Sequence, residues 1–364
     1  MLTIDQQIEE IQKEIRETPY HKGTERHIGI LKAKIAKLKV KREAAAQRGS
    51  SGRGISYAVK KQGDATVVLV GPPSAGKSTL LNALTNAESK VAPYAFTTVS
   101  VIPGMMRYQN AYIQVLDVPG LIEGAEEGKG RGREVLSIVR GADLLILVSD
   151  VARPEAIKRI TSTLERNGIR INKTPPDVIV KKKLKGGLTI KTNIKQELTK
   201  NTIREIADEM EIKSAEIQIK QKISLEELID SFAKNRVYIP AISVLNKADT
   251  LSVIPTKVGI YTNNFMDSGS KPGMTMYISA ETGQGLDELK KVIWEKLGLV
   301  KIYLVDKPMI VKKDITLADV INTIGTDFAA THRRAKIWGP GAKFPGQEVS
   351  LSKEVVEGMQ VRFI

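Results

Sequence analysis

The sequence predicts an α/β fold: a doubly wound, mostly parallel sheet with further modules before, within and after it. An apolar, β-branched run at Ala65–Val70 predicts a buried strand, and a glycine-containing loop at 71–78 separates it from a helical pattern that begins at Thr79. Two later apolar strands end in polar residues, at Asp117 and Asn246. Because parallel strands place their carboxyl ends at one edge of a sheet, we expect the loop and these residues to bind one ligand.

The N-terminal segment, residues 1–62, predicts a helical hairpin. Isoleucine recurs at three- and four-residue spacing over 4–15, and a second apolar stripe with basic residues off it covers 28–42. The break at Thr18–Gly23 separates the two helices, and a flexible Gly/Ser-containing linker follows at 48–54. We expect the stripe to pack on the partner helix or the next domain rather than on a membrane. The basic face is equally compatible with RNA contact and with solvation.

The loop at 71–78 reads GPPSAGKS and matches the phosphate-loop pattern G-x-x-x-x-G-K-[ST]. Its glycines let several backbone N–H groups face one point, where a helix N-terminus adds positive potential. We expect the Lys77 ammonium to bind β- and γ-phosphate oxygens, and the Ser78 hydroxyl to ligate Mg²⁺. The residues expected around the phosphates are Pro72, Pro73, Ser74, Ala75, Gly76, Lys77, Ser78 and Thr79.

The strand at Ala111–Leu116 ends in a D-x-x-G motif that runs from Asp117 to Gly120. We expect the carboxylate to hold Mg²⁺ through a water, and the Gly120 N–H to bond the γ-phosphate and so sense its loss. The glycine-rich segment Gly124–Arg133 is expected to be a loop that stays mobile until the γ-phosphate or a partner orders it. An ordinary surface loop is the alternative. Leu144–Ser149 predicts the next buried strand.

Residues 166–236 read as an insertion in the α/β pattern. Two strand patterns, Val178–Leu184 and Leu188–Ile194, flank a Gly-Gly pair and predict a hairpin. The elements expected next are a helix near 195–211, a strand at 216–223 and a short helix opened by a capping box at Ser224–Glu227. The lysines at 181–183 fit either an edge strand protected from aggregation or contact with a phosphate backbone, and the second reading is slightly favoured.

The α/β pattern resumes with a strand that ends in Asn246-Lys247-Ala-Asp249. The Asp249 carboxylate can accept from the ring N–H and the 2-amino group of guanine together, which adenine cannot match. This predicts discrimination of ~100-fold or more and argues against an ATPase. Asn246 is expected at the other edge of the base, and the Lys247 stem over its face. The next strand ends in Ser279, Ala280 and Glu281, where the Ala280 N–H can bond the guanine carbonyl oxygen.

After a helix predicted at Gly285–Leu297, residues 299–364 predict a compact, β-grasp-like module with a single helix. Its expected elements are strands at 301–304, 335–338 and 360–363 and a helix from Thr316 to Ile324, and His332–Arg334 is read as a solvated turn. The chain therefore divides into an N-terminal helical segment (1–62), a nucleotide-binding domain (63–165 with 237–298), an inserted α+β domain (166–236) and a tail module (299–364).

Composition and charge point to a globular protein with an anionic partner. The 364 residues are 41% apolar and 27% charged, with no cysteine, no run of membrane-span length and no signal peptide, so we expect a cytoplasmic protein without disulfides. The formal net charge is +15. Lys and Arg exceed Asp and Glu by 14 to 7 in 1–62, 16 to 10 in 166–236 and 10 to 7 in 299–364. The nucleotide-binding part is near neutral, at 16 to 17.

Five elements stand in the order that is typical of translation-factor-class GTPases: 71–78, Thr97/Thr98, 117–120, 246–249 and 279–281. More narrowly, residues 94–104 and 117–125 resemble the Obg group of these proteins. Within that group, the run at 124–133, the insertion between Asp150 and Asn246, and the tail sequence at 335–339 resemble the developmentally regulated GTP-binding (DRG) family. The resemblance covers nearly the whole chain.

The resemblance implies a GTPase domain with an inserted α+β domain and a C-terminal TGS domain. It also implies association with ribosomes or translation, and an accessory partner protein in eukaryotes. It identifies Thr98, rather than Thr97, as the threonine that ligates Mg²⁺, a choice that composition and spacing leave open. The resulting assignments are Lys77, Thr98 and Gly120 as catalytic, Ser78, Thr98 and Asp117 as metal ligands, and Phe96 and Thr97 as further nucleotide contacts.

Two departures limit the expected mechanism. Leu121 follows Gly120 where Ras-like GTPases have a water-positioning glutamine, a feature that the Obg group shares, so the hydrolytic residue stays unassigned. Relatives that use K⁺ often carry Asn where this chain has Ser74, so K⁺ dependence is left open. We expect a slow, monomeric GTPase switch with Mg²⁺ as cofactor and the ribosome or its RNA as partner. The alternative is an RNA- or ribosome-binding scaffold whose nucleotide is only structural.

Overall fold

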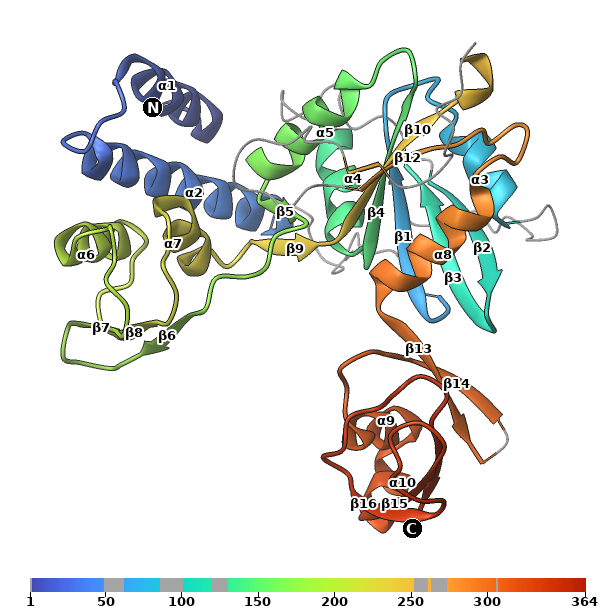
Figure 1. The fold of residues 1–364 in the computed structure, drawn as a ribbon. Coiled ribbons are helices and arrows are strands. Elements are labelled where there is room, and N and C mark those ends of the chain that lie inside the picture. The colour runs from blue at the N-terminus through green and yellow to red at the C-terminus, as the bar shows by residue number, and fades with distance from the viewer. Residues whose placement is uncertain are drawn as a thin grey trace. The chain divides into compact units, whose positions relative to one another are not determined.

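The computed structural model describes residues 2–48, 62–85, 101–118, 130–251, 261–262, 274–305 and 307–364. The chain forms two units, one of residues 1–56 and 164–238 and the other of residues 57–163 and 239–364. Their elements can be followed along the chain in Figure 1. No described helix is both long and apolar enough to cross a membrane.

The second unit contains a seven-stranded sheet with the order β11-β12-β10-β4-β1-β3-β2. Its strands are β1 (Ala65–Val70), β2 (Ile102–Tyr108), β3 (Ala111–Asp117), β4 (Leu144–Asp150), β10 (Ala241–Asn246), β11 (Tyr261–Thr262) and β12 (Met274–Tyr277). Only the edge strands β2 and β11 run antiparallel to their neighbours. The predicted α/β fold with a mostly parallel sheet is therefore confirmed.

Helices cover both faces of this sheet (Figure 1). The helices are α3 (Lys77–Thr85), α4 (Gly130–Arg140), α5 (Glu155–Arg166) and α8 (Leu286–Leu297). α3 and α8 share a core with one face of the central strands, where Leu80, Val115 and Ile146 are fully buried. Burial on both faces explains why β1, β4 and β10 read as continuous apolar runs.

The prediction of a loop over 124–133 is wrong for its last residues, because α4 already begins at Gly130. Its apolar residues Val135, Ile138 and Val139 are buried, and this packing outweighs the low helix propensity of the glycines before them. Residues 124–129 lie outside the described part of the chain. The expected mobility of the segment stays a prediction.

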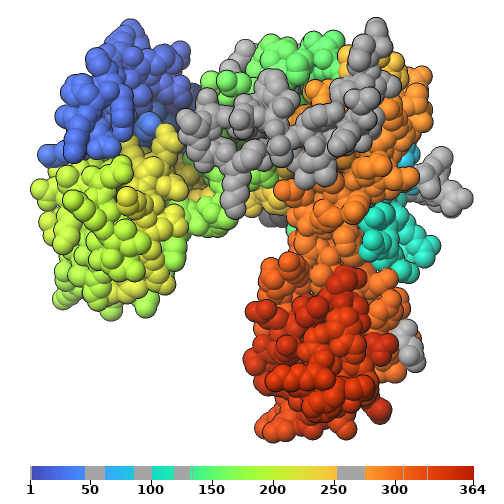
Figure 2. Space-filling view, in the orientation of Figure 1, coloured from blue at the N-terminus to red at the C-terminus, as the bar shows by residue number. Residues whose placement is uncertain are grey.

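The first unit begins with two helices, α1 (Ile4–Glu17) and α2 (Glu25–Arg48), as predicted. α2 contacts α1 and also α6 (Lys200–Glu209) and α7 (Leu225–Phe232). Ala33 and Ala36 are buried against the inserted elements, while Ile35 and Leu38 are only half-buried. Figure 2 shows residues 1–48 packed directly on the inserted segment. The hairpin thus uses one face for its partner helix and another for the insertion.

The predicted hairpin in the insertion is wrong. β6 (Val178–Lys182) and β7 (Leu188–Thr192) do not pair, because β8 (Ala215–Ile219) lies between them, antiparallel to β6 and parallel to β7. The inward residues of β8 are completely buried, whereas those of β6 and β7 are only partly so. The most buried of the three strands therefore lies at the centre, and the loop around Gly186 crosses two strand spacings. β5 (Ile169–Ile171) and β9 (Val237–Ile239) form a separate two-stranded sheet.

The tail forms a five-stranded sheet with the order β14-β13-β17-β15-β16. Its first and last strands along the chain, β13 and β17, pair in parallel, which is the arrangement of a β-grasp. Its elements are β13 (Leu299–Leu304), β14 (Lys307–Lys312), α9 (Leu317–Ile324), α10 (Thr326–Thr331), β15 (Arg334–Trp338), β16 (Gln347–Ser350) and β17 (Gln360–Phe363). The expectation of a single helix is wrong, because α10 follows α9 directly after Gly325. His332 stacks on Phe328, with ring centroids 4.0 Å apart, so this turn is packed rather than merely solvated.

Candidate functional site

The motif-bearing loops meet at one edge of the seven-stranded sheet. β1 lies between β3 and β4, with Leu69 opposite Asp117, and β10 follows β4, with Asn246 opposite Asp150. These four strands are parallel, so the residues at their carboxyl ends share the same edge. Ligands of open α/β sheets bind at this edge. The sheet therefore brings the predicted phosphate and base motifs together, and the loops after these strands form the candidate site.

Two glycines of the phosphate loop stand where no side chain fits. A Cβ on Gly71 would lie 2.2 Å from the carbonyl oxygen of Val148, and one on Gly76 would lie 2.3 Å from Asn246 Nδ2. Gly76 also has a φ of +81°, and Ser74 has a φ of +62°. Turns of this kind aim successive N–H groups into an anion-binding concavity. The local sequence thus forms a loop pressed against β4 and β10, with α3 beginning at Lys77.

Lys77 is the buried cation of this loop. Its side chain is only 9% exposed, and its ammonium donates to the carbonyl oxygen of Pro72 at 3.0 Å. Burial lowers the pKa of Lys77, and the charge of Asp117 opposes that shift. A phosphate oxygen would supply the negative charge that this ammonium receives only in part from Asp117.

Ser78 and Asp117 form the candidate metal-binding pair. The Ser78 hydroxyl donates to Asp117 Oδ2 at 2.6 Å, and Asp117 is 6% exposed. Burial raises the pKa of Asp117, while the Ser78 hydrogen bond and the Lys77 charge act in the other direction. No three Asp, Glu or His side chains converge within the described ranges. A hydroxyl beside one carboxylate fits Mg²⁺, which takes few protein ligands and completes its shell with phosphates and water.

Asn246 joins the phosphate loop to the base-side loop. The side chain is 2% exposed; its Nδ2 donates to the Ala75 carbonyl at 3.1 Å, and its Oδ1 accepts from the Ala280 N–H at 2.9 Å. Sequence reasoning placed Asn246 and the Ala280 N–H directly on the base, and it missed that the two groups bind each other. One hydrogen of Nδ2 is used by Ala75, which leaves the other for a ligand.

Lys247 and Asp249 extend from the short turn that follows β10. Lys247 has a φ of +64°, and a single 3₁₀ turn, η1 (Ala248–Thr250), comes next. The Ala248 N–H donates to the Ile278 carbonyl at 2.9 Å, which fixes this turn beside the end of β12. Both Lys247 and Asp249 are exposed, so both are accessible to a ligand.

Ser279 and Glu281 differ in environment. Ser279 is fully buried, and its Oγ accepts from the Thr282 N–H at 3.2 Å, so it stabilises the turn. Glu281 is exposed. The remaining predicted contacts, Phe96, Thr97, Thr98 and Gly120, lie outside the described residues, as does Leu121.

Sequence reasoning missed a further polar pair at the same edge. Asp150 ends β4, is 6% exposed, and accepts from Arg153, with the closest contact to Nη2 at 2.6 Å. This hydrogen bond is the main cause of the lowered pKa of Asp150. Ser149 Oγ also donates to the Arg153 carbonyl at 2.7 Å. The signal was present, because Asp150 ends an apolar strand in the same way as Asp117 and Asn246 do.

Comparisons with known proteins agree with this geometry. A family model described as 50S ribosome-binding GTPase matches residues 66–182, and one described as the C-terminal region of that domain matches 185–299. The chain is 43% identical to a GTP-binding protein of Methanocaldococcus jannaschii, covering 98% of this chain and 92% of the other. It is 40% identical to ribosome-interacting GTPase 1 of Saccharomyces cerevisiae (97% and 96%) and 39% identical to developmentally-regulated GTP-binding protein 1 of Xenopus laevis (94% and 94%).

Solved structures give a weaker comparison. The G domain of the Thermotoga maritima FeoB iron transporter is 19% identical and covers 64% of this chain and 98% of its own, with a TM-score of 0.28. A putative nucleolar GTP-binding protein of Plasmodium falciparum is 16% identical (65% and 89%), with a TM-score of 0.32. At these TM-scores, neither similarity carries weight in the assignment of function.

Proposed function

The chain belongs to the developmentally regulated GTP-binding family of GTPases, and from this we propose that it is a Mg²⁺-dependent GTP switch that docks on the ribosome. It is a GTPase that binds guanine nucleotides. The metal dependence, the switch and the ribosomal partner go beyond family membership. The observation that supports the metal dependence most directly is the 2.6 Å contact between Ser78 and Asp117 beside buried Lys77.

The phosphate end of the site is proposed to act by position and charge. The Lys77 ammonium would leave the Pro72 carbonyl and bind β- and γ-phosphate oxygens, where it stabilises charge on the transferring group. Ser78 would ligate Mg²⁺ directly and Asp117 would hold it through a water. When bound, Mg²⁺ would neutralise negative charge on the phosphates. From the resemblance, we propose that Thr98 and Gly120 close over the γ-phosphate and release on its loss.

The base end is proposed to select guanine through Asp249. Its exposed carboxylate would accept from the ring N–H and 2-amino group, and the Lys247 stem would cover the ring. Asn246 would bond the base with its second amide hydrogen while it keeps the two loops in register. Changing Asp249→Asn should shift preference toward xanthosine nucleotides, and equal competition by ATP and GTP in the wild type would disprove the assignment.

The ribosomal partner is proposed from the name of the yeast relative and from charge. Positive charge is concentrated in 1–62 and 166–236, and a polyanion such as ribosomal RNA is the partner that such segments attract. We propose that these segments, with the tail as a TGS domain, report the nucleotide state to the ribosome in the cytoplasm. The four-domain division with boundaries at 62, 165, 236 and 298 belongs to the same proposal.

Two measurements test this function. GTP turnover is measured with Mg²⁺ and with EDTA, with and without ribosomes, in the wild type, Ser78→Ala and a control, Asn82→Ala, which changes an exposed residue one turn further along α3. We expect Mg²⁺-dependent turnover that Ser78→Ala alone abolishes. Ribosome co-sedimentation is then compared with GTP, GDP and a non-hydrolysable analogue. Binding that ignores the nucleotide contradicts the switch, and binding that ignores salt contradicts phosphate contacts.

A further inference from the structure

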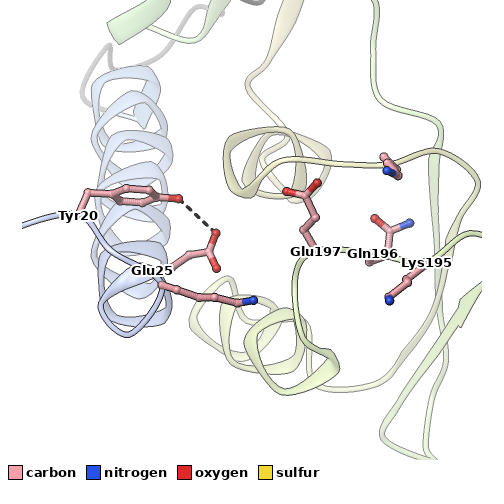
Figure 3. Close-up of a pocket in the computed structure, with 7 residues that line it drawn as sticks. Tyr20, Glu25, Lys195, Gln196 and Glu197 are labelled. Atoms are coloured by element: carbon pink, nitrogen blue, oxygen red, sulfur yellow. Dashed lines mark hydrogen bonds between the residues drawn. The ribbon is translucent and has the colours of Figure 1, made fainter.

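A groove in the first unit is lined by residues that belong to none of the nucleotide motifs. It has a volume of about 530 Å³ and is lined by Tyr20, Lys22, Glu25, Lys195, Gln196, Glu197 and Lys222. Figure 3 shows Tyr20 and Glu25 on one side of the groove and Lys195, Gln196 and Glu197 on the other. This volume is in the range of sites that hold small molecules or a nucleotide.

The groove presents one aromatic face and three cations. Tyr20 is 67% exposed, which is unusual for a large aromatic side chain, and its hydroxyl donates to Glu25 at 3.2 Å. Among the described residues, no carboxylate lies within ion-pair distance of the ammonium groups of Lys22, Lys195 or Lys222. The groove also contains two carboxylates, Glu25 and Glu197, so its three cations outnumber its anions by one.

Both walls of the groove are held in place by hydrogen bonds of their own. The turn that carries Tyr20 is closed by Thr24, whose Oγ1 donates to the Pro19 carbonyl at 2.6 Å and accepts from the His21 N–H at 3.0 Å. On the other wall, Gln196 Nε2 donates to the Gln221 carbonyl at 2.9 Å. The segments that carry Tyr20 and Gln196 are thus already ordered, which lowers the conformational entropy that ligand binding would cost.

We propose that this groove binds single-stranded RNA, with one base stacked on Tyr20 and the flanking phosphates between the three lysines. An aromatic platform beside a basic track is how proteins hold single-stranded nucleic acid. Glu197 adds an acceptor for a base amino group. The choice of RNA as ligand rests on the proposed ribosome association. The groove would be the place where the protein holds a single strand of that RNA.

The test uses the full chain and a fluorescein-labelled, unstructured RNA of about ten nucleotides, followed by anisotropy. We expect Tyr20→Ala to weaken binding by roughly 5- to 150-fold, as for one stacked base, and Tyr20→Phe to keep the affinity. Lys22→Ala and Lys222→Ala should each lower the slope of log affinity against log salt by about 0.7. The matched control is Lys291→Ala with Lys296→Ala, which removes two exposed charges on α8, outside the groove and outside the basic segments.

Three results would overturn the proposal: unchanged affinity in Tyr20→Ala, an equal loss in Tyr20→Phe, or an equal loss in the α8 control. Binding of a phosphopeptide in place of RNA would overturn it as well. Ribosome co-sedimentation separates this proposal from the proposed function. If the wild type pellets with ribosomes and Tyr20→Ala binds the oligonucleotide normally, only the groove fails. If the oligonucleotide binds through Tyr20 but the chain never pellets with ribosomes, only the ribosomal role fails.

Discussion

Replacing Asn246 by alanine should damage stability as well as nucleotide binding. The side chain is almost wholly buried and makes hydrogen bonds of 3.1 Å and 2.9 Å with Ala75 and Ala280. The substitution leaves a carbonyl and an N–H without partners. Each such group costs about 1–3 kcal/mol when it is buried, so we expect the second unit to lose about 3 kcal/mol of unfolding free energy.

The assay exploits the position of the two tryptophans. The sequence contains two, Trp294 and Trp338, and both lie in the second unit, with Trp294 in the core of the large sheet. Tryptophan fluorescence during urea unfolding therefore reports this unit. For a unit of its size, a loss of about 3 kcal/mol also corresponds to a melting temperature lower by roughly 6–12 °C.

The matched control is Asp249→Ala, three residues further along the same turn. Asp249 is exposed, so its loss should change stability by less than about 0.5 kcal/mol, while GTP affinity falls by ~100-fold or more. An Asn246→Ala variant that is as stable as the wild type would refute the role of Asn246 in holding the Ala75 and Ala280 loops together. It would return Asn246 to the simple role of base contact.

Three further predictions concern buried charges and the phosphate loop. Asp230→Asn should destabilise the first unit by about 3–5 kcal/mol, because Arg170 and Arg236 would both lose the carboxylate that they bind at 2.5–2.7 Å. During unfolding, the circular dichroism signal should change before tryptophan fluorescence does. Simultaneous changes of the two signals would contradict this prediction. Burial, and to a smaller extent neighbouring guanidinium groups, lowers the pKa of Lys39 from 10.5 to about 8. Between pH 8 and 10.5 the unfolded chain therefore binds one more proton than the folded chain, so the free energy of unfolding should rise with pH, by about 1–2 kcal/mol after solvent screening. Lys39→Met should remove this rise. Gly76→Ala should abolish GTP binding in calorimetry, because its Cβ would collide with Asn246 Nδ2 and because Gly76 has a positive φ. An unaffected affinity would show that the loop can relax.

The sequence was sufficient where structure is set by neighbours in the chain. β1 and β10 lie where their apolar runs predicted, and the positive φ of Gly76 is a local requirement that glycine meets. Capping boxes are equally local, and Ser224 caps the N-terminus of α7 as expected. These elements are specified within a few residues, so a single sequence contains enough information to place them.

The errors arise where the partner of a strand is distant in sequence. β6 and β7 have a glycine turn between them, and nothing in those residues shows that β8 will separate them. The completely buried residues of β8 decide that arrangement through packing, which no local pattern records. The bracing role of Asn246 was missed for the same reason, since its two partners are 171 and 34 residues away.

The charge distribution explains how one chain could combine a nucleotide site with the proposed RNA-binding surface. The nucleotide-binding part is near neutral, with 16 basic against 17 acidic residues, so phosphate recognition there depends on buried Lys77 and oriented amides rather than on a general positive field. The excess positive charge lies in other segments, where exposed lysines such as Lys22 and Lys222 are screened by salt. Burial protects the first kind of contact from ionic strength and leaves the second kind sensitive to it. Salt can therefore weaken attachment to a polyanion without weakening the grip on the nucleotide, which makes the two activities separable by experiment.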